Sequence, residues 1–123
     1  MLKAENISFS YINETNINNV SFTVPKGANF AIIGESGCGK STLLKVLYGL
    51  YDLKDGNIFW NSIQVLGPKY NLIPGMPFMK YLAQDFDLMP FISVAENIGK
   101  YLSNFFPEEK KARIEELLEI VEM

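Results

Sequence analysis

The first part of the chain alternates hydrophobic and polar residues, a pattern typical of half-buried strands. Residues 2–11 predict one strand, which ends in an alternating apolar face at Tyr11. Residues 20–24 alternate in the same way, and the polar, Asn-rich segment 13–19 between them predicts a turn. We therefore expect the fold to begin with an antiparallel β layer.

A different pattern follows at residues 30–33, where four apolar residues are continuous. Such a run predicts a short strand buried on both faces of a sheet. A glycine-rich segment occupies residues 34–39, and apolar residues at helical spacing then predict a helix over 40–50. The succession of buried strand, glycine-rich loop and helix indicates an α/β fold.

The middle of the chain contains fewer regular patterns. A turn at residues 55–56 leads into a predicted strand over 57–63. Prolines and glycines make residues 66–78 a loop by composition. Residues 80–83 then predict a short strand that stops at Gln84.

Two helices are predicted towards the C-terminus. Ser93 and Glu96 form a capping-box pattern, from which a helix should run to about Phe105. Pro107 fits the first turn of a last helix with one apolar face. Because no stop signal follows this helix and its apolar face needs a cover, we expect the chain to be a fragment.

Composition narrows the classes of function. The chain has 123 residues, 48% of them apolar, which is enough for one packed domain. A net charge of −3 argues against a protein that mainly binds nucleic acid. One cysteine and no histidine exclude an internal disulfide, multi-cysteine metal sites and histidine-based chemistry. No export signal and no run of ~20 apolar residues occurs, which favours the cytoplasm.

The clearest chemical signal is the segment Gly-Glu-Ser-Gly-Cys-Gly-Lys-Ser-Thr at residues 34–42. It matches G-x-x-x-x-G-K-[ST] between a predicted strand and a predicted helix, so a plain glycine-rich turn is the weaker alternative. Backbone N–H groups of such a loop and the positive end of the helix both attract phosphate. We therefore expect a nucleotide site made of Gly34, Ser36, Gly37, Cys38, Gly39, Lys40, Ser41 and Thr42.

The side chains of this segment have different expected roles. Lys40 supplies a full positive charge for the β- and γ-phosphates, Ser41 offers a hydroxyl to Mg²⁺, and Thr42 reaches a phosphate oxygen. Glu35 should face solvent, because phosphates repel an acid. Cys38 is either a small residue that fits the loop or a thiol made reactive by electropositive surroundings.

Three further features make the sequence resemble the ATPase subunit of ABC transporters. They are Tyr11 at the end of Ile-Ser-Phe-Ser-Tyr, Gln84 after its predicted strand, and Val-Ala-Glu-Asn-Ile at residues 94–98. The resemblance covers the chain and matches the first half of that domain. It implies an incomplete α/β fold of the P-loop NTPase type. The expected parts are a β layer with the phosphate loop over about 1–66, a loop segment with Gln84 over about 67–92, and the start of a helical subdomain over about 93–123. These parts would include the first strands of the family's parallel core sheet.

The resemblance also implies roles for individual residues. Tyr11 would stack on adenine, and Gln84 would approach Mg²⁺ and the attacking water. ATP and Mg²⁺ would be the cofactors, with Lys40 and Gln84 as catalytic residues and Ser41 and Gln84 as metal ligands. Taken alone, an aromatic residue at a strand end and a glutamine after a strand are more often structural.

The implied function is to couple the binding and hydrolysis of Mg-ATP to transport across a membrane. The partners would be a second ATPase domain and a transmembrane permease subunit, with no nucleic acid, and the protein would lie on the inner face of the membrane. The apolar segment 86–91 would either pack inside the helical subdomain or meet the membrane subunit.

The family's signature Leu-Ser-Gly-Gly-Gln, its Asp-Glu pair and its switch histidine are absent from these 123 residues. We therefore expect the chain by itself to be inactive in hydrolysis. The alternatives are a soluble ATPase of the same superfamily, acting in translation or DNA repair, and a truncated nucleotide binder that does not hydrolyse.

Overall fold

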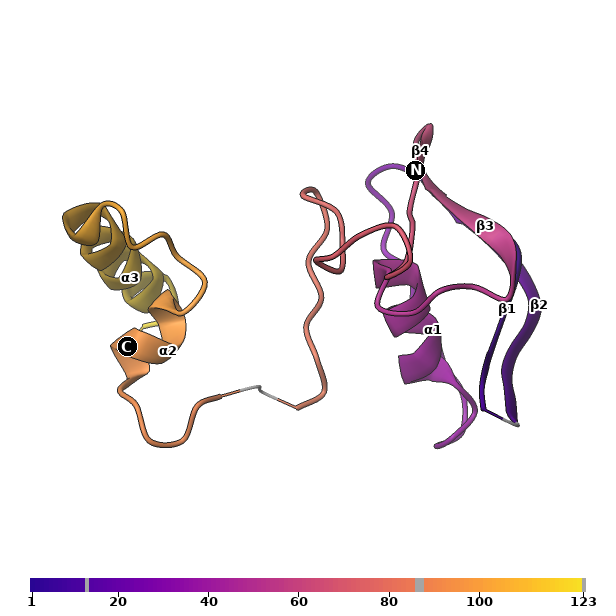
Figure 1. Ribbon diagram of the computed structural model, residues 1–123, viewed down its shortest axis with the longest axis horizontal. Helices are drawn as coiled ribbons and strands as arrows, with labels where there is room; N and C mark the ends of the chain where they lie inside the picture. The colour runs from indigo at the N-terminus through magenta and orange to yellow at the C-terminus, as the bar shows by residue number, and fades with distance from the viewer. Residues whose placement is uncertain (13, 86–87, 123) are drawn as a thin grey trace. The chain divides into compact units, whose positions relative to one another are not determined.

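The chain folds into two compact units, Met1–Tyr81 and Leu82–Met123. The structure is a computed structural model that describes residues 1–12, 14–85 and 88–122 (Figure 1).

A four-stranded sheet forms one layer of the first unit (Figure 1). Its strands are β1 (Leu2–Tyr11), β2 (Glu14–Val24), β3 (Asp55–Trp60) and β4 (Ile63–Gln64). They lie in the order β2-β1-β3-β4, and every pair is antiparallel, as the alternating pattern predicts.

The strand boundaries differ from the prediction in two places. Strand β2 begins at Glu14, so most of the predicted turn 13–19 is strand; residue 13 lies outside the described residues. The reason is tertiary, because Ile17 pairs with Phe9 of β1 and is buried. The predicted strand 57–63 is divided between β3 and β4 by a turn at Asn61, which has φ 54°.

A bulge in β1 brings two core residues onto the same face. Ala4 and Ile7 are three residues apart, so regular alternation would place them on opposite faces, yet both are buried. Asn6 between them has φ 48°, and the register with β2 shifts there. The backbone N–H of Asn6 donates to Oγ of Ser21 at 2.7 Å, so the amide at the bulge has a partner.

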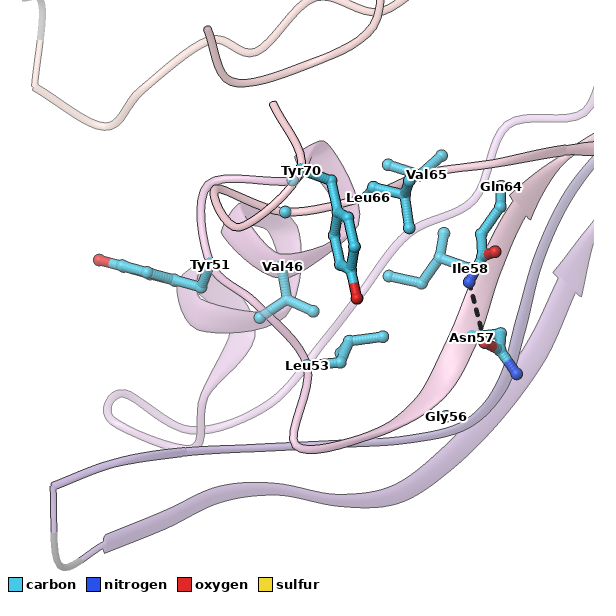
Figure 2. Close-up of a pocket in the computed structure, with 12 residues that line it drawn as sticks. Val46, Tyr51, Leu53, Gly56, Asn57, Ile58, Gln64, Val65, Leu66 and Tyr70 are labelled. Carbon is cyan, nitrogen blue, oxygen red and sulfur yellow. Dashed lines mark hydrogen bonds between the residues drawn. The ribbon is translucent and has the colours of Figure 1, made fainter. Parts of the chain in front are cut away.

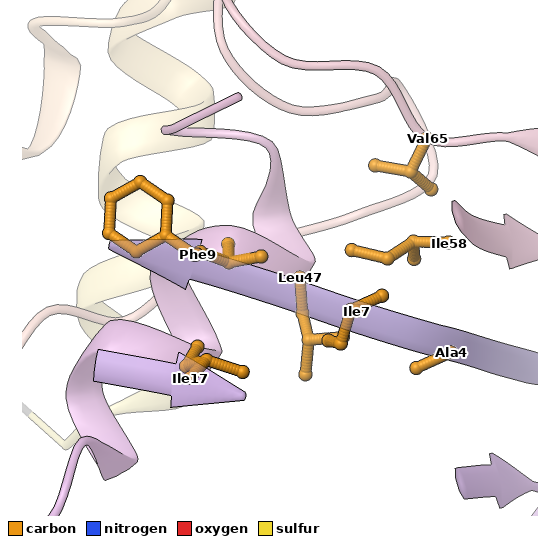
Figure 3. Packing of buried hydrophobic residues seen from close by; sticks show 8 residues of the cluster. Ala4, Ile7, Phe9, Ile17, Leu47, Ile58 and Val65 are labelled. Carbon is orange, nitrogen blue, oxygen red and sulfur yellow. The ribbon is translucent and has the colours of Figure 1, made fainter. Parts of the chain in front are cut away.

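Helix α1 (Lys40–Tyr48) covers this face of the sheet with Val46 and Leu47. It ends at Gly49, and Leu50 N–H donates to the carbonyl of Lys45 at 2.9 Å. Figure 3 shows the apolar side chains that meet between helix and strands. The buried cluster consists of Ala4, Ile7, Phe9, Ile17, Val46, Leu47, Ile58 and Val65.

Two of the predicted strands, at residues 30–33 and 80–83, are not formed. Residues 30–33 have no strand structure, and Phe30 and Ile33 are 53% and 92% exposed. Residues 80–83 are likewise irregular, with Leu82 92% exposed. A strand is held by hydrogen bonds to a neighbouring strand, and the strand pairs of the described residues involve only β1 to β4. The predicted loop over 66–78 contains no helix or strand, as expected.

The second unit contains two helices, α2 (Val94–Gly99) and α3 (Pro107–Ile120). The capping box is confirmed: Glu96 N–H donates to Oγ of Ser93, and Ser93 N–H donates to the Glu96 carboxylate. Helix α2 is shorter than predicted, since it ends at Gly99 and not near Phe105. Gly99 packs closely on α3: a Cβ on it would lie 2.8 Å from Cδ1 of Ile114.

The apolar segment after Gln84 is exposed where the structure describes it. Leu88, Met89 and Phe91 are 66%, 51% and 98% exposed, while residues 86 and 87 lie outside the described part. Their exposure leaves both sequence-based interpretations of this segment open.

Candidate phosphate-binding site

The glycine-rich segment forms a loop that leads directly into α1. Cys38 N–H donates to the Glu35 carbonyl at 3.3 Å, and Leu43 N–H makes the first helical bond to Gly39 at 2.9 Å. Gly39 is the N-cap and carries no side chain, so no side chain caps the first turn of α1. The N–H groups of that turn are therefore available to an anion.

The loop encloses a hollow of about 270 Å³, lined by Gly37, Gly39, Lys40, Ser41 and Thr42. Gly37 has φ 81°, a conformation that side-chain-bearing residues rarely adopt, and an added Cβ there would meet no atom within 4 Å. The side of Gly37 where a side chain would lie therefore faces open space. Two of the residues that line the hollow carry a hydroxyl and one is a lysine, a set that fits a phosphate group.

Lys40 is the one charged residue among those that line this hollow. Its ammonium donates to the carbonyl oxygens of Gly34 at 2.7 Å and Glu35 at 2.6 Å, and lies 3.6 Å from Sγ of Cys38. The loop backbone therefore fixes where the positive charge lies. Glu35 and Ser36 are both exposed residues. Exposure of Glu35 was expected, because phosphates repel an acid.

The structure brings Tyr11 to the phosphate loop. Its hydroxyl lies 3.4 Å from Oγ1 of Thr42, within hydrogen-bonding distance. A hydrogen bond with Thr42 lowers the pKa of Tyr11 below its usual value, and a hydrogen bond with Tyr51 lowers it further. Tyr11 is 38% exposed, so part of its ring is accessible.

Gln84 belongs to the other unit. It is an exposed residue in Leu82–Met123, whereas the loop lies in Met1–Tyr81. Its expected role at Mg²⁺ stays a prediction.

A second, larger hollow of about 400 Å³ lies beside α1 and β3 (Figure 2). Figure 2 shows its apolar wall, to which Val46, Ile58 and Val65 contribute, and the hydrogen bond of 3.0 Å from Gln64 Nε2 to Asn57 Oδ1. None of its lining residues carries a charge. It therefore does not compete with the loop as a phosphate site.

Comparison with known proteins identifies the family. Residues 17–123 match the ABC transporter family model. This chain belongs to the ABC transporter family. The predicted family and fold class are thereby confirmed.

Two curated relatives of this ABC family member are import ATP-binding proteins. The spermidine/putrescine import ATP-binding protein PotA of Thermotoga maritima is 34% identical over 109 residues, covering 87% of this chain and 28% of that protein. The Fe(3+) ions import ATP-binding protein FbpC 2 of Haemophilus influenzae is 28% identical over 122 residues, covering 98% and 34%. The chain thus spans about a third or less of the length of these two relatives.

Solved structures agree on the fold. The dimeric structure of a bacterial ABC transporter cassette superposes with a TM-score of 0.77 at 25% identity, over 100% of this chain and 58% of that chain. A nucleotide-free cassette from an ABC transporter gives 0.52 at 30% identity, over 57% and 28%. Among the helices that the structure describes, none is long and apolar enough to cross a bilayer.

Sequence reasoning did not single out Tyr51. In the sequence, Tyr51 is one aromatic residue shortly after the first predicted helix. Nothing in its position along the chain relates Tyr51 to Tyr11.

Proposed function

We propose that this chain binds Mg-ATP through its phosphate loop, as the nucleotide-binding part of a transporter ATPase. The observation that carries the proposal is the hollow lined by glycine backbone, Lys40, Ser41 and Thr42 at the uncapped start of α1. The names of the relatives, which are import ATP-binding proteins, favour transport over a soluble role in translation or DNA repair.

Each residue has a proposed task. The loop from Gly34 to Gly39 supplies N–H donors to the phosphates, and Lys40 adds a charge at the β- and γ-phosphates. The exposed hydroxyl of Ser41 fits a hard cation that prefers oxygen ligands. Bound Mg²⁺ would neutralise phosphate charge. Tyr11 offers an aromatic ring to adenine, and Gln84 would complete the metal site.

The working transporter needs more than these residues. We propose a second ATPase domain and a transmembrane permease subunit as partners, which would hold the protein on the inner face of the membrane. The 123 residues contain neither the family's signature nor its Asp-Glu pair. A sample of this chain should therefore bind ATP without turning it over, because the family's water-polarising glutamate is missing from these residues.

The test is calorimetric titration of the chain with Mg-ATP, together with an assay of phosphate release. Replacing Lys40 with Ala removes a charge-assisted hydrogen bond and should weaken Mg-ATP binding about 10-fold to 100-fold. Lys54→Ala is the matched control, since Lys54 is an exposed lysine outside the loop.

Equal affinities of the Lys40→Ala variant and the native chain would contradict the proposed site. Steady phosphate release that persists in Lys40→Ala would contradict both the site and the predicted lack of hydrolysis.

A further inference from the structure

Tyr51 lies against the aromatic residue assigned to the base. Its ring centroid is 5.6 Å from that of Tyr11, with the rings nearly perpendicular at 81°. Phe9 completes the group: its ring stacks on Tyr51 at 5.1 Å and 15°, and meets Tyr11 edge-on at 5.1 Å and 82°. Both contacts of Tyr11 have the edge-to-face geometry that aromatic quadrupoles favour.

Tyr51 is directed at Tyr11 and away from the larger hollow. Figure 2 shows its side chain pointing outward from that apolar space, although its backbone borders it. A hydrogen bond between the side chains of Tyr51 and Tyr11 raises the pKa of Tyr51 and lowers that of Tyr11. The Tyr11 oxygen thus has two partners, Tyr51 and Thr42 of the phosphate loop.

These contacts restrict the ring from two directions. A tyrosine side chain has two rotatable angles, and ring packing together with two hydroxyl contacts leaves Tyr11 little freedom about either. A group held in place before the ligand arrives loses less entropy on binding. The cluster also ties the ring to the loop, because Thr42 is both its partner and part of the phosphate hollow.

We propose that Tyr51 is a positioning residue that holds Tyr11 for the base of a bound nucleotide. This rests on the proposed function, in which Tyr11 meets adenine. Tyr51 itself does not touch the ligand. Its effect is therefore confined to ligands that carry a base.

The experiment compares Mg-ATP with Mg-tripolyphosphate, which has the phosphates and no base. Tyr51→Phe keeps the ring and removes the hydroxyl, and should weaken Mg-ATP binding about 2-fold to 10-fold while leaving tripolyphosphate unchanged. In a Tyr11→Phe background the same change should add nothing, because the Tyr11 hydroxyl that Tyr51 contacts is gone. Tyr48→Phe is the matched control, since Tyr48 ends α1 and its ring lies against that of Tyr81 instead, at 5.5 Å and 31°.

Three outcomes overturn the inference. Tyr51→Phe has no effect on ATP, or weakens ATP and tripolyphosphate equally, or adds its full effect in the Tyr11→Phe background. If Lys40→Ala still lowers binding of both ligands, these outcomes leave the proposed phosphate site intact. If the native chain binds neither ligand, the proposed function fails and the inference fails with it.

Discussion

At the scale of single residues, the sheet depends on a close approach between β3 and the bulge of β1. Gly56 has φ 89°, and a Cβ on it would lie 2.5 Å from the carbonyl oxygen of Glu5. The bulge at Asn6 moves this part of the β1 backbone towards β3, where only a hydrogen fits. The sequence identifies Gly56 as a turn residue after Asp55, but not the backbone that it meets.

Gly56→Ala should destabilise the first unit by at least about 2 kcal/mol, because it adds strained φ to a backbone clash. Gly27→Ala is the control, since Gly27 has φ 76° and an added Cβ there meets nothing within 4 Å. Gly27→Ala therefore measures the cost of placing alanine at positive φ without a clash, which is about 1 kcal/mol. Urea unfolding measures both, and similar losses in the two variants would show that the approach to β1 is unimportant.

At the scale of elements, signals between residues close together in the chain were predictable, whereas several features that depend on distant segments were not. The capping box of Ser93 and Glu96 and the first helix after the loop lie where the sequence predicts them, because their hydrogen bonds join residues three or four apart. The close packing of Gly99 on Ile114 of another helix was not predictable, because the two residues lie in different elements. The strands expected at 30–33 and 80–83 failed for the same reason, since a strand needs a neighbour.

The capping box makes α2 sensitive to pH. Hydrogen bonds from the backbone and then the side chain of Ser93 lower the pKa of Glu96. A lowered carboxyl pKa gives stability that is present above the usual glutamate range and is lost as pH falls through the folded pKa.

At pH 7, Glu96→Gln should therefore speed the exchange of α2 amide hydrogens relative to the native chain, and the difference should disappear as pH falls through the folded pKa of Glu96. Comparison at equal pH cancels the intrinsic pH dependence of exchange. Glu115→Gln on α3 lies outside the capping box and serves as the control. A difference that persists at low pH would contradict the carboxylate's role.

At the scale of the whole molecule, burial is uneven between the two units. The buried apolar cluster lies within Met1–Tyr81. In the described part of Leu82–Met123, Gly99 is the single buried residue. Helix α3 has no buried residue, although its apolar face was predicted from spacing. The free energy that holds each unit folded should differ accordingly.

Hydrogen exchange should reveal this difference. Amides of β1 and β3 should exchange at least about 10-fold more slowly than those of α2 and α3, because few apolar contacts oppose local opening in the second unit. Ile58→Ala, which removes a fully buried side chain, should speed exchange in the first unit and leave the second unchanged. Equal protection of both units, or a joint response to Ile58→Ala, would show that they unfold together.

The sequence by itself determined the phosphate loop, the helix after it, the capping box and the antiparallel pattern of the first strands. Each of these rests on residues close together in the chain, where spacing and residue type decide the structure. Only the tertiary structure decided the contact of Tyr11 with Thr42 and Tyr51, the close approach of Gly56 to the β1 backbone, and the absence of a strand at residues 30–33. These depend on packing and on hydrogen bonds between distant segments, which a single sequence does not encode as a local pattern.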